Sequence, residues 1–196
     1  QALLDIRGWD QELAEDTDIS LRLKKAGWNI VFAPEAVAIT DVPDKLGVLT
    51  RQRTRWDRGG LRNYFKKHWR LMRPSVAGWS FASEMWAEFF YAVIATLAYP
   101  VYFVWMAWTA PMALAVVLTV ASAANVLLAL LSLWVIARAC PRIHDPGRLW
   151  VAALVMPFYK GYLRWVRFRA LVMELFRYRY EDSFLPHSAW THAPRY

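Results

Sequence analysis

An acidic group, Glu15-Asp16-Thr17-Asp18, stands directly before a short amphipathic segment. A carboxylate held at the edge of a helix can take the proton of a hydroxyl while that oxygen attacks an electrophilic carbon. Acidic residues at this position also cap helices and complement the helix dipole. Taken alone, the segment allows both roles and favours the helix cap.

A second group, Gln52-Arg53-Thr54-Arg55-Trp56, follows about 35 residues later. On a helix, Gln52, Arg55 and Trp56 share one face because their spacing is i, i+3 and i+4. A guanidinium binds phosphate oxygens bidentately, and an indole offers a flat apolar surface for a sugar ring. These types fit a nucleotide-activated sugar. A basic helix that anchors at a membrane surface through its Trp explains the same residues equally well.

The order of these groups resembles that in the family 2 processive β-glycosyltransferases. That family includes cellulose, hyaluronan and chitin-oligosaccharide synthases, and the likeness is greatest to the bacterial poly-β-1,6-N-acetylglucosamine synthases. The resemblance is carried by Glu15-Asp16-Thr17-Asp18-Ile19-Ser20, Gly27-Trp28 before an aromatic run ending at Pro34, Val42-Pro43-Asp44, and Gln52-x-x-Arg55-Trp56 followed by Gly59-Gly60. It covers residues 1–73 by motif and residues 74–170 only by architecture.

The resemblance implies that Asp16 is the general base of an inverting sugar transfer. Glu15 holds its family position beside this base, and Ala14 stands where the family has Thr. Both carboxylates remain, so the departure is mild. The catalytic residues expected from the resemblance are therefore Asp16 and Glu15.

The resemblance also implies the substrate contacts. Gln52, Arg55 and Trp56 form the second motif, in which Arg55 meets the diphosphate and Trp56 the acceptor sugar at the mouth of a channel. Trp9, within Gly8-Trp9-Asp10, occupies the family's position for a loop near the acceptor.

The family holds Mg²⁺ or Mn²⁺ on the donor diphosphate with an Asp-x-Asp motif. Asp16-Thr17-Asp18 matches that spelling but belongs to the base motif, and the four His residues lack metal-ligand spacing. We therefore expect no metal ligands here and place the metal site upstream of Gln1, in a longer protein. The isolated chain is then expected to bind UDP-sugar poorly and to be inactive.

The middle of the sequence is uncharged. No Asp, Glu, Lys or Arg occurs from Phe89 to Ala137, and 57% of all residues are hydrophobic. As one helix this stretch would be about 70 Å long, more than twice the hydrocarbon thickness of a bilayer. We expect two spans, about 88–108 and 112–137, broken near Trp108 to Pro111. A third stretch, 149–168, is ambiguous because Pro and basic residues interrupt it.

The net charge of +8 is compatible with nucleic acid or with an anionic membrane surface. Many basic residues flank apolar segments among Trp and Tyr, which favours the membrane. The Arg residues between the second and third stretches place that loop, and residues 1–83, in the cytoplasm by the positive-inside rule. Glu84 and Glu88, at the start of the first span, suit either a membrane boundary or the lining of a polar channel.

The expected fold is an α/β remnant of a GT-A type glycosyltransferase domain, followed by interfacial helices and an α-helical transmembrane region. Its parts are residues 1–58 (catalytic), 59–83 (amphipathic interface helices), 84–170 (membrane helices) and 171–196 (basic tail). Within them we expect a helix over Thr17–Ala26, strands over Trp28–Ala33 and Val37–Thr40, and a helix over Asp44–Arg58, after which Gly59-Gly60 permits a sharp bend.

The function expected is membrane-embedded, inverting transfer from a UDP-sugar, such as UDP-N-acetylglucosamine, to a growing polysaccharide that is then moved across the plasma or inner membrane. The expected partners are the nucleotide-sugar donor, the polysaccharide acceptor, the lipid bilayer and an accessory membrane subunit, but no nucleic acid. Two alternatives stay open: a non-processive lipid glycosyltransferase, and a non-catalytic membrane scaffold whose motifs only cap and anchor helices.

Overall fold

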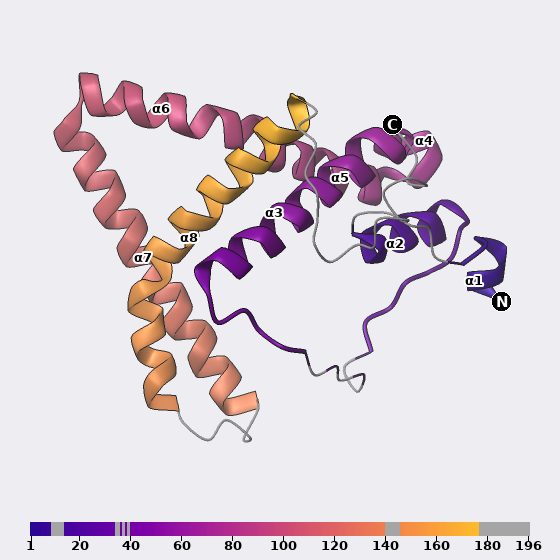
Figure 1. Cartoon of the computed structure of the whole chain (residues 1–196), viewed down its shortest axis with the longest axis horizontal. Coiled ribbons are helices and arrows are strands. Elements are labelled where there is room, and N and C mark those ends of the chain that lie inside the picture. The colour runs from indigo at the N-terminus through magenta and orange to yellow at the C-terminus, as the bar shows by residue number, and fades with distance from the viewer. Residues whose placement is uncertain (9–13, 34–35, 37, 39, 140–145, 177–196) are drawn as a thin grey trace. The chain divides into compact units, whose positions relative to one another are not determined.

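A computed structural model describes residues 1–8, 14–33, 36, 38, 40–139 and 146–176. Regular structure in these residues is entirely helical (Figure 1). In chain order the elements are α1 (Ala2–Asp5), α2 (Glu15–Lys25), α3 (Leu46–Arg62), the π-helix η1 (Asn63–Lys67), the 3₁₀-helix η2 (Trp69–Met72), α4 (Pro74–Ala77), α5 (Trp79–Phe89), the π-helix η3 (Phe90–Ala95), α6 (Thr96–Thr109), α7 (Pro111–Ala139) and α8 (Pro146–Leu175).

The strand predicted over Trp28–Ala33 is absent: these residues form exposed coil, and the side chain of Phe32 is 90% exposed. A strand gains its stability from a neighbouring strand and from side-chain burial. The described residues contain no second strand that could supply either. The prediction at 28–33 is therefore wrong for this structure. The second predicted strand includes positions 37 and 39, which lie outside the described residues, and the α/β domain stays a prediction.

Helix α2 confirms the amphipathic helix predicted from Thr17 to Ala26. Acidic residues fill its first turn and basic residues its last, in agreement with the helix dipole. Gly27, with φ of +85°, closes it in a backbone conformation that favours glycine. The spacing predicts an apolar face with Ile19, Leu23 and Ala26; in the structure Ile19 is buried, Leu23 is half-buried and Ala26 is exposed. Leu21, which is not part of that predicted face, is also buried.

Helix α3 confirms the helix predicted after Pro43 and continues as an α-helix past Gly59-Gly60, where the sequence permits a sharp bend, to Arg62. Glycine permits a bend and does not impose one. Here Leu61, one residue beyond the glycines, is buried with Ala92 and Leu171, so the turn that follows the glycines is packed against other segments. The helical geometry changes only at Asn63, where η1 begins.

The chain divides into two units: residues 1–95 with the segment from Val166 onward, and residues 96–165. The first unit has two small apolar clusters. Leu21 of α2, Leu71 of η2 and Met85 of α5 form one, and Leu61, Ala92 and Leu171 form the other. The first cluster fixes α2 and α5 beside each other, which matters for the site described below.

The second unit consists of α6, α7 and the first part of α8. Helices α6 and α7 are separated at Ala110, within the predicted break. Inside this unit the Lys160 ammonium of α8 donates to Oδ1 of Asn125 in α7 at 2.7 Å, and the Arg164 guanidinium lies over the ring of Tyr99.

Two helical stretches in the described residues, Trp79–Thr109 and Pro111–Arg138, are long and apolar enough to cross a membrane, judged by length and composition alone. The side chains of α7 are almost all exposed or half-buried, as expected of a helix whose apolar surface is not covered by protein. Helix α8, which contains the ambiguous stretch 149–168, does not meet the same criteria.

Candidate functional site

The acidic motif lies at the start of α2, where the backbone turns sharply. Ala14, the residue before the helix, has φ of 59° and ψ of 58°, a left-handed conformation that is uncommon for a residue with a Cβ. The Asn63 amide donates to the backbone carbonyl of Ala14 at 2.9 Å and fixes this turn from η1. The turn delivers Asp16 and Asp18 into the first turn of α2.

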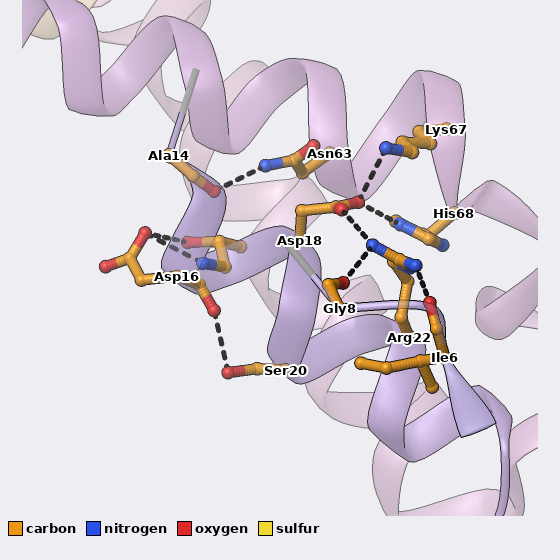
Figure 2. A network of polar contacts seen from close by, with 11 residues as sticks. Ile6, Gly8, Ala14, Asp16, Asp18, Ser20, Arg22, Asn63, Lys67 and His68 are labelled. Atoms are coloured by element: carbon orange, nitrogen blue, oxygen red, sulfur yellow. Dashed lines mark hydrogen bonds and ion pairs between the residues drawn. The ribbon is translucent and has the colours of Figure 1, made fainter. Parts of the chain in front are cut away.

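The two aspartates of this turn have different surroundings, because residues i and i+2 of a helix face different sides. Figure 2 shows the carboxylate of Asp16 pointing away from the carboxylate of Asp18 and from the basic side chains around it. Asp16 is exposed and accepts a hydrogen bond from the Thr17 backbone N–H at 2.7 Å. Asp18 is 1% exposed. The two carboxylates of the Asp-x-Asp sequence thus differ: that of Asp16 is exposed and that of Asp18 is buried.

Asp16 borders a cavity of about 610 Å³ between α2 and α5. Its lining combines carboxylates, hydroxyl and amide groups, one ammonium, aromatic rings and aliphatic side chains. The lining residues are Asp16, Thr17, Ser20, Leu21, Lys24, Asn29, Ile30, Tyr64, Phe81, Glu84, Met85 and Glu88. Glu15 is exposed and is not among them.

Glu84 and Glu88 of α5 line the same cavity as Asp16. They are one turn apart on α5, so both can face one cavity. The pKa of Tyr64, which also lines the cavity, is raised by burial and further by the charges of Glu88, Asp16 and Glu84. The fields of all three carboxylates therefore converge on this phenol. This position favours cavity lining over a membrane-boundary role alone.

Asp18 is the centre of a buried ionic cluster that ties α2 to η1 and to the chain around it (Figure 2). Its Oδ1 lies 2.9 Å from Lys67 Nζ and 2.8 Å from His68 Nε2, and its Oδ2 lies 3.6 Å from Arg22 Nη1. Arg22 in turn donates to the backbone carbonyls of Ile6 and Gly8. Asp18 thus anchors the helix that presents Asp16.

The His68 imidazole of this cluster is held mainly neutral. Burial lowers its pKa below the ordinary value, although the hydrogen bond and charge of Asp18 act in the opposite direction. Nδ1 of the ring is buried and has no hydrogen-bond partner among the described residues, while Nε2 faces the Asp18 carboxylate. A neutral ring with its proton on Nε2 satisfies this geometry, since the proton is then donated to Asp18.

We expect the stability of the protein to fall as the pH drops from 7.5 to 5.5, in part through His68. The unfolded chain protonates this ring near its ordinary pKa of about 6.5, and the folded chain only at a lower pH. The stability that the neutral His68 ring contributes is therefore present above about pH 6.5 and is lost as the pH falls through the pKa of the folded state. Each unit of pKa difference corresponds to about 1.4 kcal/mol.

Thermal unfolding of wild type and His68→Gln at both pH values measures this effect. Glutamine can still donate to Asp18 but does not titrate. The melting temperature of His68→Gln should therefore fall less between pH 7.5 and pH 5.5 than that of wild type. Equal losses in both proteins would contradict the assignment.

The second motif lies on α3, on the predicted helix. Gln52 and Arg55 are half-buried, and Trp56 is 46% exposed, with the Arg53 guanidinium 4.6 Å from the centre of its ring. None of the motif's three residues is among the described residues that line the cavity. The structure therefore does not unite the two motifs in one cavity. Trp9, the remaining predicted contact, lies outside the described residues.

Asn63 and Glu174, which the sequence did not single out, and Asp18, which it named only as part of the acidic motif, prove to be central. Asn63 holds the turn at Ala14, Asp18 anchors α2, and Glu174 of α8 is buried among cations of α3 and η1. A signal existed for Glu174, which is the only acidic residue between Asp145 and Glu181 in a basic, apolar stretch. No comparable pattern marks Asn63.

The described residues contain no group of three or more side chains with the geometry to hold a metal ion. Asp18, the second carboxylate of the Asp-x-Asp spelling, already faces Lys67 and Arg22, and these cations would repel a metal. The donor set here does not fit Mg²⁺ or Mn²⁺, so no chemical step below is assigned to a metal.

Among known protein families, one family model, "Glycosyl transferase family group 2", matches residues 1–178, nearly the whole chain. Curated relatives match over shorter segments. A probable glycosyltransferase, YdaM, of Bacillus subtilis is 45% identical over 26% of this chain and 13% of its own length. An N-acetylglucosaminyltransferase of Rhizobium sp. is 37% identical over 29% of this chain and 13% of its own length.

A poly-beta-1,6-N-acetyl-D-glucosamine synthase of Staphylococcus aureus is 38% identical over 33% of this chain and 17% of its own length. The chain thus spans less than a fifth of the length of these relatives. No solved structure matches it significantly. These matches confirm the resemblance drawn from the two motifs. With a family model matched from residue 1 to residue 178, this chain belongs to glycosyl transferase family group 2.

Proposed function

We propose that this chain is the acceptor-side part of a membrane-bound synthase that transfers N-acetylglucosamine from UDP-N-acetylglucosamine to a growing β-linked polysaccharide. The donor and the polymer are suggested by the printed names of the N-acetylglucosaminyltransferases and the poly-beta-1,6-N-acetyl-D-glucosamine synthase that it resembles. The observation that carries the proposal is the open carboxylate of Asp16 at the edge of a cavity large enough for sugar units.

The chemistry at Asp16 is a single displacement. An acceptor hydroxyl in the cavity attacks the anomeric carbon of the donor, and its proton passes to the free oxygen of the Asp16 carboxylate. The new glycosidic C–O bond forms as the bond to the UDP oxygen breaks, and UDP leaves with the bonding electrons. Attack opposite to the leaving group inverts the anomeric configuration, which yields a β-linkage from an α-linked donor.

The lining of the cavity suits an acceptor sugar better than a diphosphate. Asp16, Glu84 and Glu88 are three carboxylates against one cation, Lys24, so an anionic donor group is disfavoured here. Carboxylates accept hydrogen bonds from sugar hydroxyls, and the rings of Tyr64 and Phe81 supply flat apolar surfaces. We assign the cavity to the terminal sugars of the acceptor.

The second motif has the chemistry for the donor's leaving group. The Arg55 guanidinium is suited to stabilise the charge that develops on the diphosphate, and Gln52 lies one turn away on the same helix. The exposed indole of Trp56 offers a stacking surface for an acceptor sugar. We propose that the metal on the diphosphate is held by residues outside this chain.

The membrane assignment rests on the two stretches Trp79–Thr109 and Pro111–Arg138. We propose that both cross the plasma or inner membrane, that the chain before them is cytoplasmic, and that the polymer leaves across the same membrane. Glu84 and Glu88 lie in the first stretch and also line the cavity. That placement puts the acceptor cavity beside the start of a span. An accessory membrane subunit is a further proposed partner.

Product size tests the function against its nearest rival, a transferase that adds one sugar to a lipid. Membranes that contain the full-length protein are given UDP-N-acetylglucosamine with a radioactive sugar, and the products are separated by length. We expect a ladder of polymers that a β-N-acetylglucosaminidase degrades. A single organic-soluble glycolipid would support the lipid transferase, and no incorporation at all would support a scaffold.

A further inference from the structure

The last ten residues of α8 lie against α3, the helix that carries Gln52, Arg55 and Trp56. Residues from Val166 onward belong to the same unit as residues 1–95. Glu174 is only 6% exposed there. Its two carboxylate oxygens are shared among three cations spaced four residues apart along α3 and η1: Arg58 Nε at 3.2 Å, Arg62 Nε at 3.0 Å and Lys66 Nζ at 2.6 Å.

Two further contacts lie along the same side of α8. Arg167 Nε donates to Oδ1 of Asp57 at 3.2 Å, and Leu171 is buried with Leu61 and Ala92. Positions 167, 171 and 174 are spaced by four and three residues, so they share one helix face. We call Glu174, Leu171 and Arg167, with their partners on α3 and η1, the α8 clamp.

The Glu174 carboxylate is ionised within this clamp. Burial would raise its pKa, but the hydrogen bonds from Arg62 and Lys66, together with the charges of these two residues, outweigh burial and lower it. A buried, charged carboxylate with three cationic partners has a fixed position, because any displacement leaves charges uncompensated in a poorly solvated site. Glu174 therefore defines where α3 lies relative to the last ten residues of α8.

The clamp acts on the part of α3 that continues directly from the second motif. Asp57 follows Trp56 in sequence, and Arg58 lies three residues after Arg55 on the same uninterrupted helix. A rigid helix transmits a rotation or translation of residues 57–66 to residues 52–56. Reacting groups that are misplaced by about an ångström lose on the order of 10²-fold in rate.

We propose that Glu174 is a positioning residue, which holds α3 through Arg58, Arg62 and Lys66 so that the guanidinium of Arg55 meets the UDP leaving group. This inference rests on the donor-side role proposed for the second motif. Glu174 touches no substrate in this scheme, and its negative charge is what the position requires.

The test uses the full-length enzyme with Glu174→Gln, Glu174→Asp and Arg169→Gln. Arg169 is an exposed basic residue of the same helix outside the clamp and serves as the matched control. We measure the binding of UDP and kcat per folded molecule, with the folded fraction counted by size-exclusion chromatography. These two readouts do not move if Glu174 contributes only to the yield of folded protein.

We expect Glu174→Gln to weaken UDP binding about tenfold and to lower kcat by about 10- to 100-fold. Glu174→Asp, which keeps the charge, should restore both to within about threefold, and Arg169→Gln should match wild type. If Glu174→Gln does not fold, Arg62→Gln replaces it, because Arg62 is one-third exposed and supplies one of three cations. Its effect should be smaller and in the same direction.

Wild-type UDP affinity and kcat in folded Glu174→Gln, or in Arg62→Gln where that variant replaces it, would overturn the proposal, and so would Glu174→Asp values as poor as those of Glu174→Gln. The result is separable from the proposed function as a whole. If Asp16→Asn leaves synthesis unchanged, the assignment of the base fails. The UDP-binding measurement still decides whether Glu174 positions α3.

Discussion

Replacement of Asp16 by Asn in the full-length enzyme should lower kcat for sugar transfer by about 10²- to 10⁴-fold, the usual contribution of a general base. The amide has the shape of the carboxylate but cannot take the acceptor proton. Asp16 is exposed, and its carboxylate makes only local hydrogen bonds to Thr17. We therefore expect the melting temperature to change by less than about 2 °C.

Asp41→Asn is the control, because Asp41 is an exposed aspartate outside the two motifs and does not line the cavity. Transfer of radioactive sugar to polymer measures both variants. Asp41→Asn should retain activity within about threefold. Full synthesis by Asp16→Asn would instead favour a scaffold whose acidic residues only begin a helix.

Sequence patterns predicted α2, α3 and the break between α6 and α7, because each of these has local signals. Helix α2 is marked by its charge distribution and by Gly27, and the break between α6 and α7 by Pro111. The strand expected at 28–33 failed because a strand is defined by its neighbours, and the described residues contain none. The packing of Leu61, which follows Gly59-Gly60, on Leu171 joins positions over 100 residues apart in sequence, and no local pattern predicts such a contact.

The candidate site was predicted only in part, because local patterns do not show how distant segments pack. The motif identified Asp16 as the candidate base, and the structure adds the cavity beside it. The motif did not indicate that Asp18 is buried, since two Asp residues read alike in a sequence. The sequence left Glu84 and Glu88 between a membrane boundary and a polar channel, because only the packing of α5 on α2, through Met85 and Leu21, brings them to the cavity.

Replacement of the two aspartates of the motif should have different effects. Asp18→Asn is expected to lower the free energy of unfolding. Asparagine leaves Lys67 and Arg22 without their buried counter-charge, and breaking such a pair costs about 3–5 kcal/mol. The apparent melting temperature of the purified protein should therefore fall by several degrees. Asp41→Asn, at an exposed aspartate, is the control and should match wild type.

Activity per folded molecule decides whether Asp18 acts only through the fold. Its carboxylate points into the ionic cluster and away from Asp16 (Figure 2), so it cannot take the acceptor proton directly. At a temperature well below unfolding, Asp18→Asn should keep kcat within about tenfold of wild type, whereas Asp16→Asn loses at least about a hundredfold with its stability intact. The opposite pattern, a stable but inactive Asp18→Asn, would move the catalytic assignment from Asp16 to Asp18.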